Sequence, residues 1–176
     1  MKHNQSIAVI DFGSQYTQLI ARRIRELNVF SEILPFTITL EELKERNVKA
    51  IILSGGPSSV YEKNAPKIDG AILQSGIPIL GICYGLQLLM QFSGGHVHST
   101  GKGEYGFAKI NPDSSSPLFS EFPSESQVWM SHGDQVDQLP EGWEIISKST
   151  NGVVAAVQKK DESIFGVQFH PEVIHS

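Results

Sequence analysis

Cysteine and basic residues are both scarce in this sequence. Cys83 is the one cysteine among 176 residues, which excludes an internal disulfide. Lys and Arg together number 14 against 19 Asp and Glu, so the formal net charge is −5 and the isoelectric point lies near 5.6. Nonspecific binding to nucleic acid or to an acidic membrane needs a basic surface, and this balance argues against both. The one basic cluster, Arg22, Arg23 and Arg25, is interpreted as the solvated face of a helix.

Long hydrophobic runs are also lacking. No stretch approaches the roughly 20 apolar residues that cross a bilayer, and the apolar run that ends before Asp11 is too short for a secretory signal. Together with the lone cysteine, this predicts a cytoplasmic protein. A 40% hydrophobic share with 19% charged residues is typical of a globular chain with a real core. At this length we expect a single domain over residues 1–176.

The first half of the chain alternates β-branched runs with amphipathic segments, which is typical of βαβ units and a parallel sheet. We predict strands over residues 7–12, 29–36, 50–57 and 77–83. Helices are predicted over residues 15–28 and 40–47, between Asn64 and Gly76, and from the segment after Cys83 to Gly94. The apolar face of the first helix runs from Tyr16 to Leu27, with Ser14 as its expected cap, and Thr39 with Glu42 forms a capping box before the second.

From about residue 96 the pattern changes to alternating segments separated by turns, which favours antiparallel strands. These segments are residues 107–112, 126–134, 143–149, 153–160 and 163–172. We therefore predict an α/β fold of three layers, with a mainly parallel central sheet, helices on both faces and an antiparallel extension in the second half.

The segment Gly81-Ile82-Cys83-Tyr84-Gly85 lies where a predicted strand leads into a predicted helix. A nucleophile at such a junction sits on a tight elbow that needs glycine neighbours, because Cβ atoms there would collide with the turn. The helix start favours a thiolate, but the helix dipole contributes only about 0.3–1 kcal/mol, too little to ionise a thiol near pH 7. A base partner is therefore needed. A buried cysteine that packs as a small hydrophobe is the alternative.

His170 is the strongest base candidate. A residue before proline favours an extended conformation, and positions two apart in an extended segment point to the same side. Glu172 can therefore reach one nitrogen of the His170 ring while the other nitrogen faces Cys83. This predicts a triad of nucleophile, base and orienting carboxylate. The alternative is a surface turn in which the histidine and the glutamate are both solvated.

The remaining histidines offer a different chemistry. His96 and His98 could share a strand face and bind a metal together with His132. No acidic or thiol ligand of suitable spacing supports them, so we expect no metal site.

The turn Ser54-Gly55-Gly56-Pro57 ends a predicted parallel strand, at the sheet edge where α/β folds place ligands. A thiolate that attacks a carbonyl leaves an oxyanion, which needs N–H donors. The N–H groups of Gly56 and Tyr84 are the candidates for this oxyanion hole. A simple glycine turn at the end of a strand is the alternative.

Taken together, these motifs resemble the class I, triad-type glutamine amidotransferase family over essentially the whole chain. The resemblance rests on GICYG around Cys83, on Gln87, on the SGGP turn at 54–57 and on HPE at 170–172. Two further segments, IDFGSQY at 10–16 and WMSHGD at 129–134, narrow it to members that serve purine nucleotide synthesis. The resemblance implies the flavodoxin-like three-layer fold of that family.

The resemblance also implies an activity: hydrolysis of the side-chain amide of L-glutamine through a γ-glutamyl thioester on Cys83. It places Gln87, Ser131, the His132 backbone and Asp134 around the substrate. Asp134 is an anionic candidate for the α-ammonium, with a plain turn residue as the alternative. The resemblance implies no cofactor in this domain. The ammonia is expected to pass directly to an ATP pyrophosphatase domain or subunit that carries ATP and Mg²⁺.

The chain departs from the family in three respects. It lacks the SGG-x-D-S pyrophosphate loop of the ATP-using part, and it ends four residues after Glu172, where relatives continue. Gly103 stands where relatives often carry arginine. We therefore expect either a separate glutaminase subunit or a shortened piece of a longer enzyme. Two other functions stay open: a stand-alone cysteine hydrolase, such as a γ-glutamyl hydrolase or a small peptidase, and a docking module without turnover.

Overall fold

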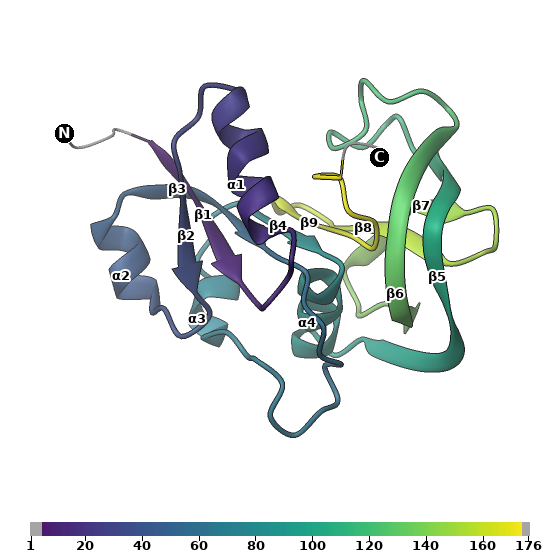
Figure 1. The fold of residues 1–176 in the computed structure, drawn as a ribbon, viewed down its shortest axis with the longest axis horizontal. Coiled ribbons are helices and arrows are strands. Elements are labelled where there is room, and N and C mark those ends of the chain that lie inside the picture. Colours follow the sequence, from purple (N-terminus) through teal and green to yellow (C-terminus); the bar gives the residue numbers. More distant parts are fainter. Residues whose placement is uncertain (1–4, 174–176) are drawn as a thin grey trace.

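The computed structural model describes residues 5–173, without the side chains of residues 100–102. In this part of the chain nine strands form one sheet in the order β2-β1-β3-β4-β9-β8-β7-β5-β6 (Figure 1). The strands are β1 (Ser6–Asp11), β2 (Ser31–Pro35), β3 (Val48–Leu53), β4 (Ile79–Ile82), β5 (His96–Pro112), β6 (Ser126–Gln138), β7 (Trp143–Ser149), β8 (Val154–Lys159) and β9 (Ile164–Val167). The helices are α1 (Thr17–Glu26), α2 (Leu40–Glu45), α3 (Gly70–Leu73) and α4 (Tyr84–Phe92).

The sheet has a parallel and an antiparallel half. Strands β2, β1, β3, β4 and β9 are parallel neighbours, in the order of a flavodoxin-like sheet with β9 as the fifth strand. Strands β8, β7, β5 and β6 continue the sheet in antiparallel pairs. The predicted α/β class and the antiparallel extension are confirmed, although the pairings are evenly divided rather than mainly parallel.

Strand β9 does not belong to the antiparallel extension in which the sequence pattern placed it. It inserts between β4 and β8, parallel to the first and antiparallel to the second. Three of its four residues are buried, which the hydrophobic pattern predicts, but such a pattern carries no information about the neighbouring strand. The carboxyl end of β9 consequently lies beside the carboxyl end of β4.

Helices cover both faces of the parallel half, as predicted. Helix α1 lies on one face, where Ile20 and Ile24 pack with Val9 of β1 (Figure 1). Helices α2, α3 and α4 lie on the other face, where Leu43 and Leu89 join a second core cluster. Burial of apolar surface, at about 25 cal/mol per Å², holds the three layers together.

The first helix begins later and ends earlier than predicted. Tyr16 occupies the cap position of α1, and no side chain caps it. The Ser14 hydroxyl instead accepts a hydrogen bond from the Tyr16 N–H at 3.0 Å, within the turn that precedes the helix. Leu27 lies beyond the last helical turn and is 75% exposed. The predictions of a Ser14 cap and a buried Leu27 are therefore wrong.

The helix predicted between Asn64 and Gly76 is reduced to the single turn of α3. Pro66 disfavours a helical conformation at the residue before it and supplies no N–H, which delays the start. The Asp69 carboxylate then caps the turn by accepting a hydrogen bond from the Ala71 N–H at 3.0 Å. Ile72 is nevertheless fully buried, as its place in the apolar pattern predicts.

The capping box of α2 is present as predicted. The Glu42 N–H donates to the Thr39 hydroxyl and the Thr39 N–H donates to the Glu42 carboxylate, each at 3.2 Å. None of the helices in the described part is both long and apolar enough to cross a membrane.

Candidate active site

Cys83 sits on a sharp turn between β4 and α4. Its φ of 52° and ψ of −104° lie in a region that residues with side chains rarely adopt. A Cβ atom at Gly85 would overlap the backbone of Leu53, and one at Gly81 would lie 2.7 Å from the Gly85 carbonyl. Both glycines are therefore required by backbone crowding at the elbow, for the reason that the G-x-C-x-G spacing suggested.

The pairing of β4 with β9 brings His170 to this elbow. Ile82 lies opposite Val167 in the parallel register, and the Cys83 N–H donates to the Val167 carbonyl at 2.8 Å. The chain then passes β6, where the His170 N–H donates to the Trp129 carbonyl at 2.9 Å. Cys83 and His170 line the same cavity of about 320 Å³, although 87 positions separate them in the sequence.

The His170 ring is buried and bonded to Glu172. Its Nδ1 donates to the Glu172 carboxylate at 2.7 Å, and the second carboxylate oxygen is buried without a hydrogen-bond partner in the described part of the chain. Burial alone would lower the pKa of His170. Hydrogen bonds to Cys83 and Glu172 and the charges of both outweigh burial and raise the pKa to about 10. The structure thus places nucleophile, imidazole and carboxylate candidates together, in the order that the sequence predicted.

Helix α1 also contacts the segment that carries these residues. The Tyr16 ring meets the His170 ring edge to face, with centroids 5.3 Å apart. The Arg23 guanidinium donates to the backbone carbonyl of Glu172 at 3.2 Å and pairs with Glu26. Arg23 is therefore more than part of a solvated helix face, which corrects the interpretation of the arginine cluster.

The two glycines after Ser54 have different surroundings. Gly56 lines the cavity at Cys83, and a Cβ atom there would lie 2.5 Å from the Phe12 carbonyl oxygen. Gly55 is the glycine that leaves space at the candidate pair, since its Cβ would lie 3.0 Å from the His170 ring. Tyr84 opens α4, where the first N–H groups have no acceptor within the helix. Gly56 and Tyr84 both line a second cavity that contains Cys83.

This second cavity, of about 370 Å³, brings together the four residues that the resemblance placed around the substrate. Gln87, Ser131, His132 and Asp134 all line it. Gln87 and the His132 ring are buried and held by hydrogen bonds within the protein, whereas Asp134 is half-buried and Ser131 exposed. Glu62 from the loop before α3 adds a second carboxylate that the sequence patterns did not indicate.

Gln168 is the main residue that sequence reasoning missed. Its side chain is fully buried, and its amide nitrogen lies 3.5 Å from the Cys83 sulfur. No local pattern indicates Gln168, because its contact with Cys83 depends on the pairing of β9 with β4.

The extended segment predicted over residues 163–172 is wrong beyond Val167: the chain bends there and turns at Pro171 and Glu172, where the Val173 N–H donates to the His170 carbonyl at 3.3 Å. Glu172 therefore reaches the His170 ring through a turn and not along an extended chain.

Two of the three histidines considered as metal ligands form other polar contacts. His96 pairs with Asp137 at 2.6 Å, and the His132 ring lies between the Asp134 carbonyl at 2.8 Å and Glu104 at 3.1 Å. Over residues 5–173 no group of three or more His, Cys, Asp or Glu side chains is arranged to hold a metal ion.

Comparison with known proteins assigns the family. The model of the class I glutamine amidotransferases matches residues 8–176. The chain belongs to this family. Membership agrees with the GICYG, SGGP and HPE motifs and with the geometry around Cys83.

Curated relatives align with essentially the whole chain. The chain is 51% identical over 177 residues to the glutamine-hydrolysing GMP synthase of Brachyspira hyodysenteriae. This alignment covers 100% of this chain and 34% of that protein. The chain is 55% identical over 176 residues to the enzyme of the same name from Prochlorococcus marinus. That alignment covers 99% of this chain and 33% of the relative. The chain thus spans about a third of the length of these relatives.

Two solved structures share the fold. A candidate GMP synthase component from Thermoplasma acidophilum superposes with a TM-score of 0.88 at 33% identity, covering 98% of this chain and 87% of that one. A glutamine amidotransferase from Thermotoga maritima superposes with a TM-score of 0.77 at 25% identity, covering 97% and 77%.

Proposed function

We propose that this chain hydrolyses the side-chain amide of L-glutamine and supplies the ammonia to a synthetase that makes GMP. The observation that carries the proposal is the convergence of Cys83, on its elbow, with the buried His170–Glu172 pair in one cavity. The family supports amide transfer from glutamine, and the names of the relatives support GMP synthesis as the pathway served.

In the proposed reaction the Cys83 thiolate attacks the amide carbon. The N–H groups of Gly56 and Tyr84 hold the oxyanion, and His170 gives its proton to the leaving nitrogen, which departs as ammonia. A γ-glutamyl thioester remains on Cys83. Water then gives a proton to His170 and attacks the thioester, which releases glutamate and restores the thiolate and the imidazolium. Glu172 orients the ring and stabilises its charged form.

Substrate selection is proposed to rest on the second cavity. Asp134 attracts the α-ammonium of glutamine, while Gln87, Ser131 and the His132 backbone complete the site. Ammonia becomes ammonium in neutral water and is then no nucleophile, so it must pass directly to the partner. That partner is proposed to be an ATP pyrophosphatase domain or subunit that binds ATP and Mg²⁺ and converts XMP to GMP.

The test labels Cys83 with a glutamine-analogue diazoketone and measures ammonia release from glutamine in the presence of the synthetase, XMP and ATP. We expect labelling of Cys83 alone, protection by glutamine, and loss of ammonia release in Cys83→Ala. Matched incubation with γ-glutamyl peptides separates a general γ-glutamyl hydrolase, which would cleave them. Absence of labelling in folded protein joined to its synthetase would overturn the proposal and favour a docking module.

A further inference from the structure

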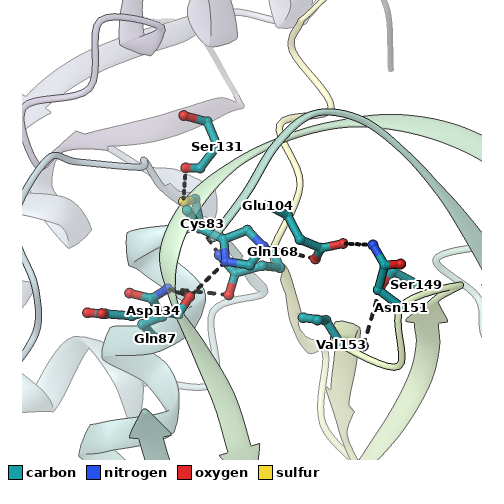
Figure 2. A network of polar contacts seen from close by, with 10 residues as sticks. Cys83, Gln87, Glu104, Ser131, Asp134, Ser149, Asn151, Val153 and Gln168 are labelled. Carbon is teal, nitrogen blue, oxygen red and sulfur yellow. Dashed lines mark hydrogen bonds and ion pairs between the residues drawn. The ribbon is translucent and has the colours of Figure 1, made fainter. Parts of the chain in front are cut away.

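The Gln168 side-chain amide donates a hydrogen bond to the sulfur of the candidate nucleophile, Cys83. Gln168 follows β9 directly, as Cys83 follows β4, so the parallel register puts the two residues side by side. The Gln168 side chain is fully buried, and its Nε2 lies 3.5 Å from the Cys83 Sγ, within hydrogen-bonding range of sulfur (Figure 2). A buried amide in this position is held there by the packing around it.

Gln87 determines which end of that amide faces the sulfur. The Asp134 backbone carbonyl can only accept, so the Gln87 nitrogen at 3.1 Å from it is the donor. The same nitrogen lies 3.3 Å from the Gln168 oxygen, which also accepts (Figure 2). Because an amide carries its oxygen and nitrogen on opposite sides, the Gln168 nitrogen is left pointing to Cys83. Asp134, Gln87 and Gln168 thus form a hydrogen-bond relay that ends at the sulfur, in which Gln87 donates to both of its neighbours and Gln168 donates to Cys83.

The starting point of this relay is itself fixed. The Asp134 carbonyl accepts a second hydrogen bond, from the His132 Nδ1 at 2.8 Å. The other ring nitrogen of His132 pairs with the Glu104 carboxylate at 3.1 Å, and the His132 side chain is almost completely buried. Glu104 in turn accepts from the Asn151 amide at 3.1 Å (Figure 2).

The sulfur also has a neighbour that favours the protonated thiol over the thiolate. The Cys83 thiol donates to the Ser131 carbonyl at 3.6 Å, a contact that favours the protonated sulfur because a carbonyl oxygen repels an anion (Figure 2). An N–H donor from Gln168 favours the anion instead. The protonation of the sulfur therefore depends on the balance between these contacts and the imidazole of His170.

We propose that Gln168 is a positioning residue that donates a hydrogen bond to the Cys83 thiolate, with its amide oriented by Gln87. The inference deepens the proposed function, since it rests on Cys83 as the nucleophile. Gln168 contacts the nucleophile rather than the substrate. Its loss moves the pH range in which the sulfur is reactive, whereas a purely structural role would change stability alone.

The test measures the rate of alkylation of Cys83 by iodoacetamide against pH in the intact chain, where the single cysteine makes the readout unambiguous. Gln168→Met keeps the length of the side chain and removes the donor. We expect the midpoint of the profile to rise by about half to one pH unit and the rate at pH 7 to fall about threefold to tenfold, the size of one net hydrogen bond. Val157→Ala, a buried truncation on β8 in the core cluster that does not contain Cys83, controls for lost packing and leaves the midpoint in place.

Gln87→Met tests the relay without altering residue 168. It frees the Gln168 amide to rotate, so we expect a smaller rise of the midpoint, and no added effect in the Gln168→Met background. If Gln168→Met does not fold, Gln87→Met carries the test. An unchanged midpoint in the folded variants overturns the relay while leaving the proposed function intact. A wild-type sulfur that reacts no faster at pH 7 than in the urea-unfolded chain overturns both.

Discussion

At the residue scale, Glu172 holds the His170 ring through one short hydrogen bond in a buried setting. Glu172→Gln keeps the shape of the side chain but removes its negative charge. Because that charge opposes the lowering effect of burial, the pKa of His170 falls from about 10. We expect ammonia release to fall about 10²–10⁴-fold. Histidine ¹⁵N shifts followed through a pH titration check the pKa. A variant that keeps both the pKa and the activity would exclude the proposed orienting role of the carboxylate.

Gly55 makes a second prediction at this scale. A Cβ atom at residue 55 would lie 3.0 Å from the His170 ring and 3.5 Å from the Cys83 Cβ, close enough to displace the ring by a few tenths of an ångström. We expect Gly55→Ala to fold with little loss of stability and to lose about tenfold or more in diazoketone labelling, because misplacement of a reacting group is costly. Gly85→Ala, which meets the Leu53 backbone instead, is the contrast and loses stability. Equal labelling of Gly55→Ala and wild type would contradict the tight contact.

At the element scale, helix α1 is tied to the segment after β9 through Arg23 and the Glu172 carbonyl. Arg23→Met keeps most of the apolar stem and removes the donor. We expect Cys83 labelling to slow about threefold to tenfold, since one hydrogen bond from a charged group no longer holds the segment. Arg22→Met removes a neighbouring, exposed arginine and is the matched control. Equal slowing in both variants would show that the lost positive charge, and not the lost hydrogen bond from Arg23 to the Glu172 carbonyl, is the cause.

The elements also show what a sequence can and cannot predict. Local patterns located most of the strands, the α2 capping box and the Cys83 elbow, because periodicity and turn chemistry act over a few residues. They started β5 at residue 107 instead of His96 and extended β9 to residue 172, although that strand ends at Val167. They missed the short α3, where Pro66 outweighs an apolar spacing, and the position of β9, which depends on partners far along the chain. Gln168 escaped notice for the same reason, since its contact with Cys83 follows from the pairing of β9 with β4.

At the scale of the whole molecule, the raised pKa of His170 links stability to pH. The folded-state pKa of about 10 lies above the ordinary value of 6.5, so this stabilisation is complete below about pH 6.5 and is lost as the pH rises toward 10. We expect the urea midpoint of the wild type to fall more between pH 6 and pH 9 than that of His170→Gln, which has no imidazole to titrate. Parallel falls in both proteins would show that other groups dominate this range.

The central place of β9 has a consequence for synthesis. A ribosome completes Cys83 well before it reaches His170, and until β9 inserts, β4 and β8 are unpaired edges of two separate sheets. The nascent polypeptide therefore carries a thiol with no base beside it. Under the proposed function, Cys83 therefore meets its base only after β9 has joined the two halves of the sheet.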